Sequence, residues 1–290
     1  MSFFALSEPE KADAASSFPC TADASSATMA RTMRIPHERE FPFGLTEIGA
    51  RAARSLMNFG ILRLKAGQSW SSRSDKERAL ILLDGQVELS WDGEKRVISR
   101  ESLFDQAPWC LSLPAGAEVI IKAQGRDAEV SVHATKNNRS FTPHLYTPEE
   151  CRSEERGKGT MKETSTRVVR TIIEDPKGAH SNFVLGEVIT YPGKWSSYPP
   201  HHHPQPEIYH YRFQRADGFG LCQIGNDAHV LRQRDTVIIP PGAVHPHTAA
   251  PGYAMYYIWV IRHLDGNRYG TPTFVPEHTW VTNPKAKIWG

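Results

Sequence analysis

Residues 199–213 read PPHHHPQPEIYHYRF, a segment in which three adjacent histidines precede an apolar run. In an extended segment successive side chains alternate between two faces, so His201 and His203 project to one side and His202 to the other. Glu207 keeps the parity of His201 and His203, although the intervening prolines bend the backbone. The spacing H-x-H-x3-E therefore offers two imidazoles and one carboxylate to a single point.

A second segment, residues 240–245, reads PPGAVH and brings His245 as a third imidazole from a neighbouring strand. Three imidazoles and a carboxylate form a mixed nitrogen and oxygen shell that suits a divalent transition metal. Histidines flanked by prolines are also compatible with a solvated loop that binds nothing. The chain concentrates its histidines here, at His201, His202, His203, His210, His245 and His247.

Short apolar or alternating runs separated by turn formers recur along both halves of the chain, which is typical of antiparallel sandwiches and barrels. The turn before a late strand is similar in the two halves, LPAG at 113–116 and IPPG at 239–242, which favours a duplicated domain. The sequence therefore predicts an all-β fold. The runs fall at 60–64, 79–83, 86–91, 118–121, 181–189, 207–213, 218–223, 236–239 and 256–260.

In a chain with this strand pattern, H-x-H-x3-E followed by PxGxxH resembles the two-part motif of the cupin superfamily. The resemblance implies two tandem cupin barrels (double-stranded β-helix, jelly-roll). The charged segment 147–158 suits a short helix plus the linker between them. Arg234 stands where the second cupin motif usually has glycine. The first half has SDKER at 74–78 and PAGAE at 114–118, without histidine, so we expect a metal-free barrel with a structural role. The expected domains are a flexible extension (1–32), an N-terminal cupin domain without a metal site (33–155) and a C-terminal cupin domain with the metal site (156–290).

Composition excludes several classes of protein. The chain has 290 residues, 39% of them hydrophobic, and a formal net charge of +2, so neither disorder throughout nor binding to nucleic acid is indicated. The apolar run at 255–261 is far shorter than the roughly 20 residues that cross a bilayer. The N-terminal residues lack a basic segment of the kind that opens a secretory signal, so we expect a cytoplasmic protein. The cysteines have no CxxC spacing and are expected to be reduced, at Cys20, Cys110, Cys151 and Cys222.

A closer resemblance covers nearly everything after the extension. The blocks WSSYPPHHH (195–203), EIYHYRF (207–213) and AAPGY (249–253) resemble the 5-deoxyglucuronate isomerase family of inositol catabolism, as do RGKG at 156–159 and PEHTWV at 276–281. The resemblance implies a bicupin that interconverts 5-deoxyglucuronate and 5-dehydro-2-deoxygluconate. It places the metal ligands on His201, His203, Glu207 and His245. Departures from the family pattern leave these ligands intact and bear on which sugar acid is used; they fall at Lys194, His210, Ala254 and Trp259.

An aldose–ketose isomerase moves a proton between adjacent carbons, and a divalent cation stabilises the negative charge that develops. Zinc or manganese is favoured, with iron or nickel as alternatives, because imidazole-rich ligation admits all of them. Parity makes Tyr209, Tyr211 and His247 candidates for the base. His247 is preferred because imidazole starts near a pKa of 6.5, whereas the pKa of tyrosine is near 10. Arg212 and Lys194 lie nearest in sequence as partners for a substrate carboxylate, although Arg212 has the opposite parity to Glu207.

Two other functions use the same residues. A cupin dioxygenase or decarboxylase could hold iron or manganese in the same ligand set. A non-catalytic cupin that binds a sugar acid is less favoured, because no helix-turn-helix or other output segment is visible in the sequence. We expect a small-molecule sugar acid as the partner, neither nucleic acid nor membrane, and leave a homo-oligomer open.

Overall fold

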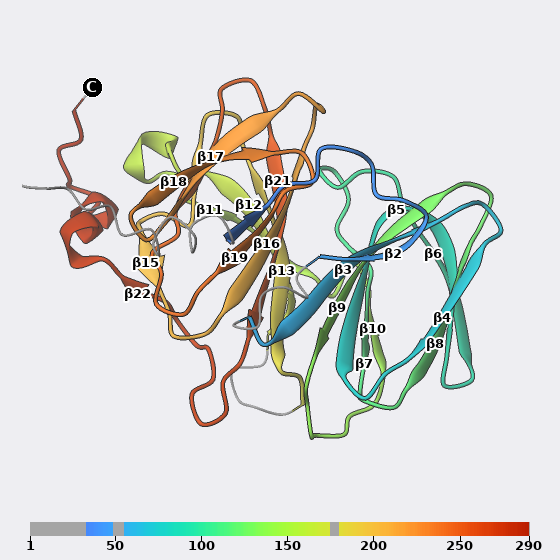
Figure 1. Cartoon of the computed structure of the whole chain (residues 1–290). Helices are drawn as coiled ribbons and strands as arrows, with labels where there is room; N and C mark the ends of the chain where they lie inside the picture. The colour runs from blue at the N-terminus through green and yellow to red at the C-terminus, as the bar shows by residue number, and fades with distance from the viewer. Residues whose placement is uncertain (1–32, 49–54, 175–179, 290) are drawn as a thin grey trace, which may run out of the picture.

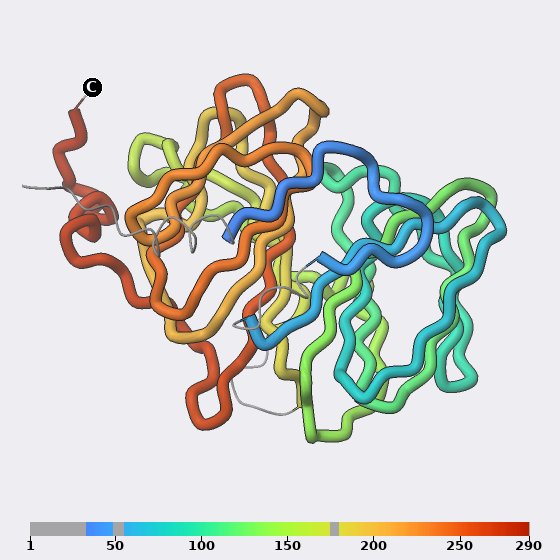
Figure 2. The backbone as a smooth tube through the Cα atoms, viewed as in Figure 1, coloured from blue at the N-terminus to red at the C-terminus, as the bar shows by residue number. Residues whose placement is uncertain are grey.

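The computed structural model describes residues 33–48, 55–174 and 180–289, and within them it forms two β-barrels side by side (Figure 1). The all-β fold with two tandem barrels predicted from the sequence is confirmed. The tube in Figure 2 shows the first barrel in blue to green and the second in yellow to red. The predicted extension, 1–32, lies outside the described residues.

The first barrel combines a sheet of order β10-β7-β5-β9-β3-β2 with a second layer in which β4 pairs with β8, while β6 and β8 both pair with β5. The strand β5 is long enough to belong to both layers, which closes the barrel at this corner. Its strands are β2 (Gly44–Glu47), β3 (Met57–Leu64), β4 (Ser69–Arg73), β5 (Glu77–Trp91), β6 (Glu94–Arg100), β7 (Cys110–Leu113), β8 (Glu118–Ala123), β9 (Ala128–Thr135) and β10 (His144–Tyr146).

The second barrel has a seven-stranded sheet of order β1-β19-β16-β21-β13-β12-β11, a sheet of order β14-β20-β17-β18 and the short pair β15-β22. Two 3-10 helices, η1 (Met161–Glu163) and η2 (Pro276–Thr282), accompany it. Its strands are β1 (Arg34–Ile35), β11 (Arg152–Arg156), β12 (Arg167–Ile173), β13 (Phe183–Thr190), β14 (Trp195–Ser196), β15 (His201–His202), β16 (Glu207–Phe213), β17 (Phe219–Ile224), β18 (Asp227–Arg232), β19 (Thr236–Ile239), β20 (His247–Ala249), β21 (Met255–Arg262) and β22 (Thr273–Phe274).

Strand β16 is buried along its whole length because it packs on both faces. Tyr209 and Tyr211 belong to the apolar cluster inside the second barrel. Ile208 belongs to a different cluster, which lies between the two barrels and includes Phe59 of the first. The alternation of side chains along one strand thus separates residues that face the second barrel's interior from residues that face the other barrel.

The prediction of a helix within 147–158 is wrong, because this segment contains a turn followed by β11. The sequence of β11, RSEER, is charged, and the strand lies at the edge of the seven-stranded sheet, where charged side chains remain in water and discourage further pairing. Among the described strands it pairs with β12 alone, with Arg156 opposite Arg167. The opposite edge is formed by β1, so the first strand described in the chain pairs with the second barrel.

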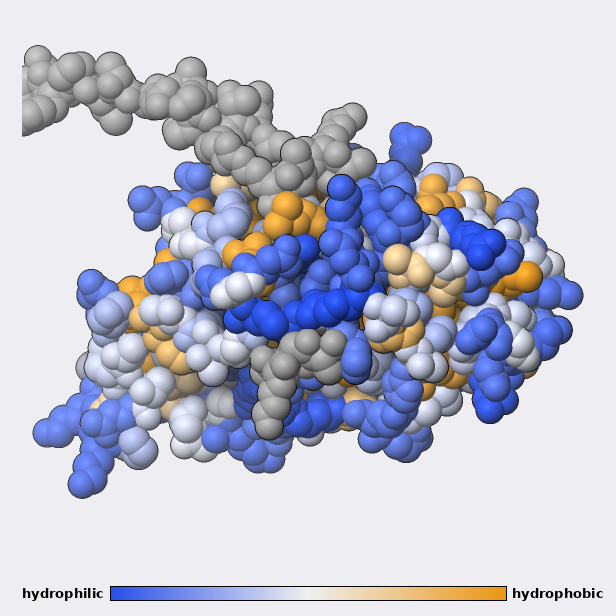
Figure 3. All heavy atoms as spheres, turned by 90° about the horizontal axis from the view of Figure 1, so that it is seen from below, coloured by the Kyte–Doolittle hydropathy of each residue, from blue (hydrophilic) through white to orange (hydrophobic). Residues whose placement is uncertain are grey.

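Among the described residues, the helices are too short or too polar to cross a membrane. The view from below in Figure 3 shows a face on which hydrophilic groups predominate over small hydrophobic patches. The three cysteines within the described residues, Cys110, Cys151 and Cys222, are free thiols and are buried. Cys20 lies outside the described residues.

Candidate active site

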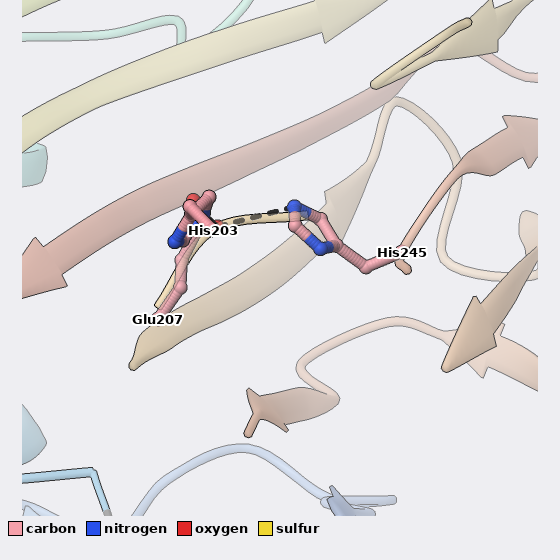
Figure 4. Close-up of side chains that lie close together, drawn as sticks. All are labelled: His203, Glu207 and His245. Atoms are coloured by element: carbon pink, nitrogen blue, oxygen red, sulfur yellow. Dashed lines mark hydrogen bonds and ion pairs between the residues drawn. The ribbon is translucent and has the colours of Figure 1, made fainter. Parts of the chain in front are cut away.

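Three of the predicted ligands converge inside the second barrel: one donor atom from each of His203, Glu207 and His245 lies within 4.8 Å of the others (Figure 4). His203 follows β15, and Glu207 begins β16. The register places Glu207 opposite Ile239 at the end of β19, and His245 lies on the loop that follows. Antiparallel pairing of β16 with β19 therefore brings the two sequence motifs together.

Backbone carbonyls fix the orientation of the two imidazoles. Nδ1 of His203 donates to the carbonyl of Gln205 at 2.9 Å, and Nδ1 of His245 donates to the carbonyl of Ala243 at 2.8 Å. The Nε2 atom of each ring is then left to face the site, as in imidazoles that bind a metal.

The spacing of the three donor atoms fits a cation. Nε2 of His203 lies 3.1 Å from Oε2 of Glu207, and Nε2 of His245 lies 3.3 Å from the same oxygen. Neighbouring ligands at right angles around an ion with bonds of about 2.1 Å lie about 3 Å apart. In addition, Nε2 of His245 is buried without a hydrogen-bond partner, which is costly unless a ligand satisfies it. The residues present therefore fit a divalent metal ion.

Electrostatics favour an ionised carboxylate at the centre of the cluster. Burial raises the pKa of Glu207, but the contacts of its carboxylate with His203 and His245 outweigh this effect and lower the pKa to about 2. Glu207 therefore carries its charge at neutral pH, as a metal ligand must.

His201, the fourth predicted ligand, lies beside this cluster but outside it. Its ring stands edge-on to that of His245 with centroids 4.9 Å apart, and its Nδ1 donates to the carbonyl of Pro199 at 3.1 Å. Burial, followed by the nearby charge of His245, lowers the pKa of His201 to about 4. The imidazole is therefore neutral at physiological pH.

A cavity of about 280 Å³ opens beside the cluster. Two guanidinium groups lie in its wall, those of Arg156 and Arg167, which the sequence analysis did not select because both precede the histidine motif by more than thirty residues. Pairing of β11 with β12 places these two arginines opposite each other, but the segment that forms β11 was expected to be a linker. The cavity is also lined by Ser197, His201, His203, Glu207 and Tyr209.

Of the three candidate bases, Tyr209 lies in the cavity wall, and His247 and Tyr211 lie behind it. Tyr209 lines the cavity, and its hydroxyl lies 3.4 Å from Oγ of Ser197. His247 is fully buried; its Nε2 lies 3.1 Å from Oγ of Ser197 and its Nδ1 lies 3.0 Å from the hydroxyl of Tyr211. Of these four residues, only Ser197 and Tyr209 line the cavity. Ser197, which the sequence analysis did not select, thus connects His247 to it.

Burial sets the pKa values of these groups. It lowers the pKa of His247 well below its usual value, with a further contribution from the charge of His245. It raises the pKa values of Tyr209 and Tyr211 well above that of free tyrosine. In this structure all three groups are therefore neutral at pH 7.

The structure does not bring Arg212 or Lys194 to the cavity. Arg212 points to the first barrel, where it forms an ion pair with Glu129 and lies over the ring of Phe41. Lys194 donates from Nζ to the carbonyl of Glu163. Successive side chains of β16 alternate between its two faces, and Arg212 has the opposite parity to Glu207. This alternation explains why Arg212 points away from the cavity.

The turn at Arg234 agrees with the motif analysis. Arg234 adopts φ 71°, the left-handed backbone conformation for which glycine is favoured at this turn. The turn is therefore kept, although arginine stands where the motif usually has glycine.

In the first barrel, Glu77 is buried and accepts hydrogen bonds from Ser181 and Asn182 of the second half. Among the described residues, the metal-type cluster found is the one in the second barrel.

Two tandem barrels with a histidine and glutamate cluster in the second define a bicupin with a candidate metal centre. The match to a family model is extensive, covering residues 37–281. The chain belongs to the KduI/IolB family.

Curated relatives carry a consistent name. The chain is 29% identical over 256 residues to the 5-deoxy-glucuronate isomerase of Geobacillus kaustophilus, a match that covers 79% of this chain and 87% of the relative. It is 26% identical over 275 residues to the enzyme of the same name from Halalkalibacterium halodurans, covering 87% and 99%.

Solved structures extend the comparison. An IolB-like protein from Salmonella typhimurium superposes with a TM-score of 0.77 at 26% identity and covers 86% of this chain and 98% of its own. An oxalate decarboxylase from Lactobacillus farciminis, with a TM-score of 0.61 and 11% identity over 84% of this chain and 89% of its own, shares the fold alone.

Proposed function

We propose that this chain is a metal-dependent aldose–ketose isomerase that converts 5-deoxyglucuronate to 5-dehydro-2-deoxygluconate in the catabolism of myo-inositol. The observation that carries the proposal is the convergence of His203, Glu207 and His245 beside a cavity. The names of the curated relatives support the choice of substrate.

His201, His203, Glu207 and His245 would hold one divalent metal ion, zinc or manganese. When bound, such an ion supplies Lewis-acid stabilisation for the negative charge that develops on adjacent oxygens of the sugar. Because the ring of His201 lies beside that of His245, rotation about the side-chain bonds of His201 would turn its ring toward the cluster.

The chain's own residues would handle the proton. Ser197 and Tyr209 present hydroxyl groups to the cavity, where they can meet a substrate hydrogen or hydroxyl. His247 accepts a proton from the hydroxyl of Ser197 and returns it, so it acts through Ser197 instead of touching the sugar. Tyr211 is a positioning residue that holds the other ring nitrogen of His247. Buried, water-excluded positions of this kind strengthen such hydrogen bonds.

The test is metal analysis of the purified full-length chain combined with an assay for ketose formation from 5-deoxyglucuronate. We expect about one divalent ion per chain and turnover. Glu207→Gln and His203→Gln should lose both metal and activity. The matched control is His202→Gln, because His202 belongs to the same histidine run but does not line the cavity.

Two results would overturn the proposal. One is absence of ketose formation by fully metal-loaded protein. The other is oxygen consumption with a carboxylic acid substrate, which would assign the site to oxygenase or decarboxylase chemistry.

A further inference from the structure

Arg167 is a cation in the cavity wall that has no carboxylate partner in the described part of the chain. Its Nη1 donates to the carbonyl of Ser165 at 2.7 Å and to the hydroxyl of the same residue at 3.0 Å. Within the described ranges, no aspartate or glutamate lies within ion-pair distance of Arg167, whereas the buried Arg100 and Arg212 each have one. Because buried charges are usually paired, the guanidinium of Arg167 is available to bind an anion in the cavity.

A second guanidinium stands next to it. Arg156 of β11 is directly opposite Arg167 of β12, and both line the cavity. Like charges directly opposite each other destabilise a sheet. Arg156 reaches Glu154 with its Nε at 2.9 Å, but that pair is exposed to solvent. An anion in the cavity would offset the repulsion between the two guanidinium groups.

Glu207 is the carboxylate among the lining residues, and it is engaged by His203 and His245. The cavity therefore has a candidate metal centre contributed by the end of β15, the start of β16 and the loop before β20, and a cationic wall contributed by β11 and β12. A sugar acid matches this arrangement of the cavity, because its carbonyl and its carboxylate are at opposite ends of the carbon chain.

We propose that Arg167 binds the carboxylate of the sugar acid, with Arg156 as a second, solvent-exposed cation, and that this contact selects acids over neutral aldoses. The inference rests on the proposed function. Ser165 holds one edge of the guanidinium, which leaves the remaining nitrogens to make the two-point contact for which arginine is suited. Arg167 contributes specificity and orientation and takes no part in proton transfer.

The experiment compares an acid with its neutral counterpart: 5-deoxyglucuronate and 5-deoxyglucose, which has a hydroxymethyl group in place of the carboxylate. For the metal-loaded wild type we expect a clear preference for the acid. Arg167→Gln should raise KM for the acid about 30-fold, with kcat changed much less, because a hydrogen-bonded charge contact made equally in the ground and transition states is lost. Its KM for 5-deoxyglucose should stay the same, so the preference collapses.

Further variants separate binding from folding. Arg167→Lys keeps the charge and should recover part of the preference, and Arg156→Gln should shift it in the same direction by a smaller factor. Arg152→Gln, on the same strand as Arg156 but outside the cavity wall, is the matched control and should behave as wild type. Metal content and the thermal unfolding midpoint show whether each variant is folded.

Direct titration of the zinc-loaded protein with each sugar gives the acid-to-neutral ratio of Kd without turnover. If the wild type binds and converts the acid but Arg167→Gln keeps the same preference, the carboxylate assignment is wrong and the isomerase remains. If the wild type converts neither sugar yet binds the acid preferentially through Arg167, the isomerase is wrong and the assignment remains. Equal binding of both sugars by the wild type overturns the assignment in either case.

Discussion

Arg100 of the first barrel and Glu187 of the second form a two-point ion pair at the contact between the barrels. Nη1 donates to Oε1 at 2.7 Å and Nη2 donates to Oε2 at 2.8 Å, and the side chains are 1% and 0% exposed. The hydroxyl of Tyr256 donates to the same carboxylate at 2.5 Å. The carboxylate of Glu187 is thus engaged from both barrels, and the pair joins the first barrel to the one that carries the candidate site.

Replacing one partner of this pair should destabilise the whole chain. Arg100→Met leaves the carboxylate of Glu187 buried without its two-point partner, and we expect a loss of about 3–5 kcal/mol in the free energy of unfolding, measured in urea. The control is Arg215→Gln, which removes an exposed pair with Asp217 and should cost less than about 1 kcal/mol. The double variant Arg100→Met with Glu187→Leu should recover much of the loss. Equal stability of Arg100→Met and the control would show that the pair does not join the barrels.

Removing the metal should lower stability through the site in the second barrel. A ligand that binds only the folded chain stabilises it by about 4 kcal/mol at a thousand times its Kd, so treatment with a chelator should lower the thermal unfolding midpoint reversibly. His245→Gln should abolish the response to added zinc, because His245 contributes the buried Nε2 that lacks a partner. His202→Gln should respond as the wild type does. A midpoint that is insensitive to chelator in the metal-loaded wild type would contradict the metal centre.

The positions of three of the four candidate ligands were predictable because local spacing and strand pairing determine them, whereas His201 lies outside the cluster. His203 and Glu207 lie in one short segment, and the antiparallel pairing of β16 with β19 places His245 nearby. The same alternation correctly assigned Arg212 to the face opposite Glu207. Strand periodicity also gave the two barrels, since each half alternates apolar runs with turns.

The cationic wall was not predictable from spacing. Arg156 and Arg167 come from strands that precede the ligand motif, and the charged composition of β11 suggested a helix because a solvated helix and an edge strand both tolerate such residues. Ser197 was missed for a related reason: its contact with His247 depends on the fold of the loop between β14 and β15, where it adopts φ 52°. Sequence proximity therefore selected Lys194, whose ammonium group contacts a backbone carbonyl instead.

Stability should fall as the pH is lowered, because His133 is buried as the neutral imidazole. Burial lowers its pKa to about 3, whereas the unfolded chain has a value near 6.5. Between these values the unfolded state binds more protons than the folded state, so stability is complete above about pH 6.5 and is lost as the pH falls toward 3. His133 should contribute a slope of up to about 1.4 kcal/mol per pH unit in this window.

His133→Gln should reduce that slope when urea unfolding is measured from pH 7 to pH 4. His210 packs on the same ring, that of Phe59, and burial also lowers its pKa, so part of the slope should remain in the single variant. His278→Gln, at an exposed position in η2, should leave the slope unchanged. An unchanged slope in His133→Gln would mean that this histidine is protonated or exposed in the folded chain.

Ser197→Ala tests whether His247 reaches the substrate through the serine hydroxyl. Because His247 is fully buried and hydrogen-bonds Ser197 at the cavity wall, we expect kcat for ketose formation to fall about 100-fold, within the range typical of lost acid–base catalysis, while metal content and KM stay near wild type. Ser197 adopts φ 52°, so Ser197→Gly removes the same hydroxyl while relieving the strain at this position. The two variants should therefore have the same kcat but different unfolding free energies, with the glycine variant more stable. A kcat that follows stability instead, low in the alanine variant and restored in the glycine variant, would assign Ser197 a structural role and leave Tyr209 as the hydroxyl that transfers the proton.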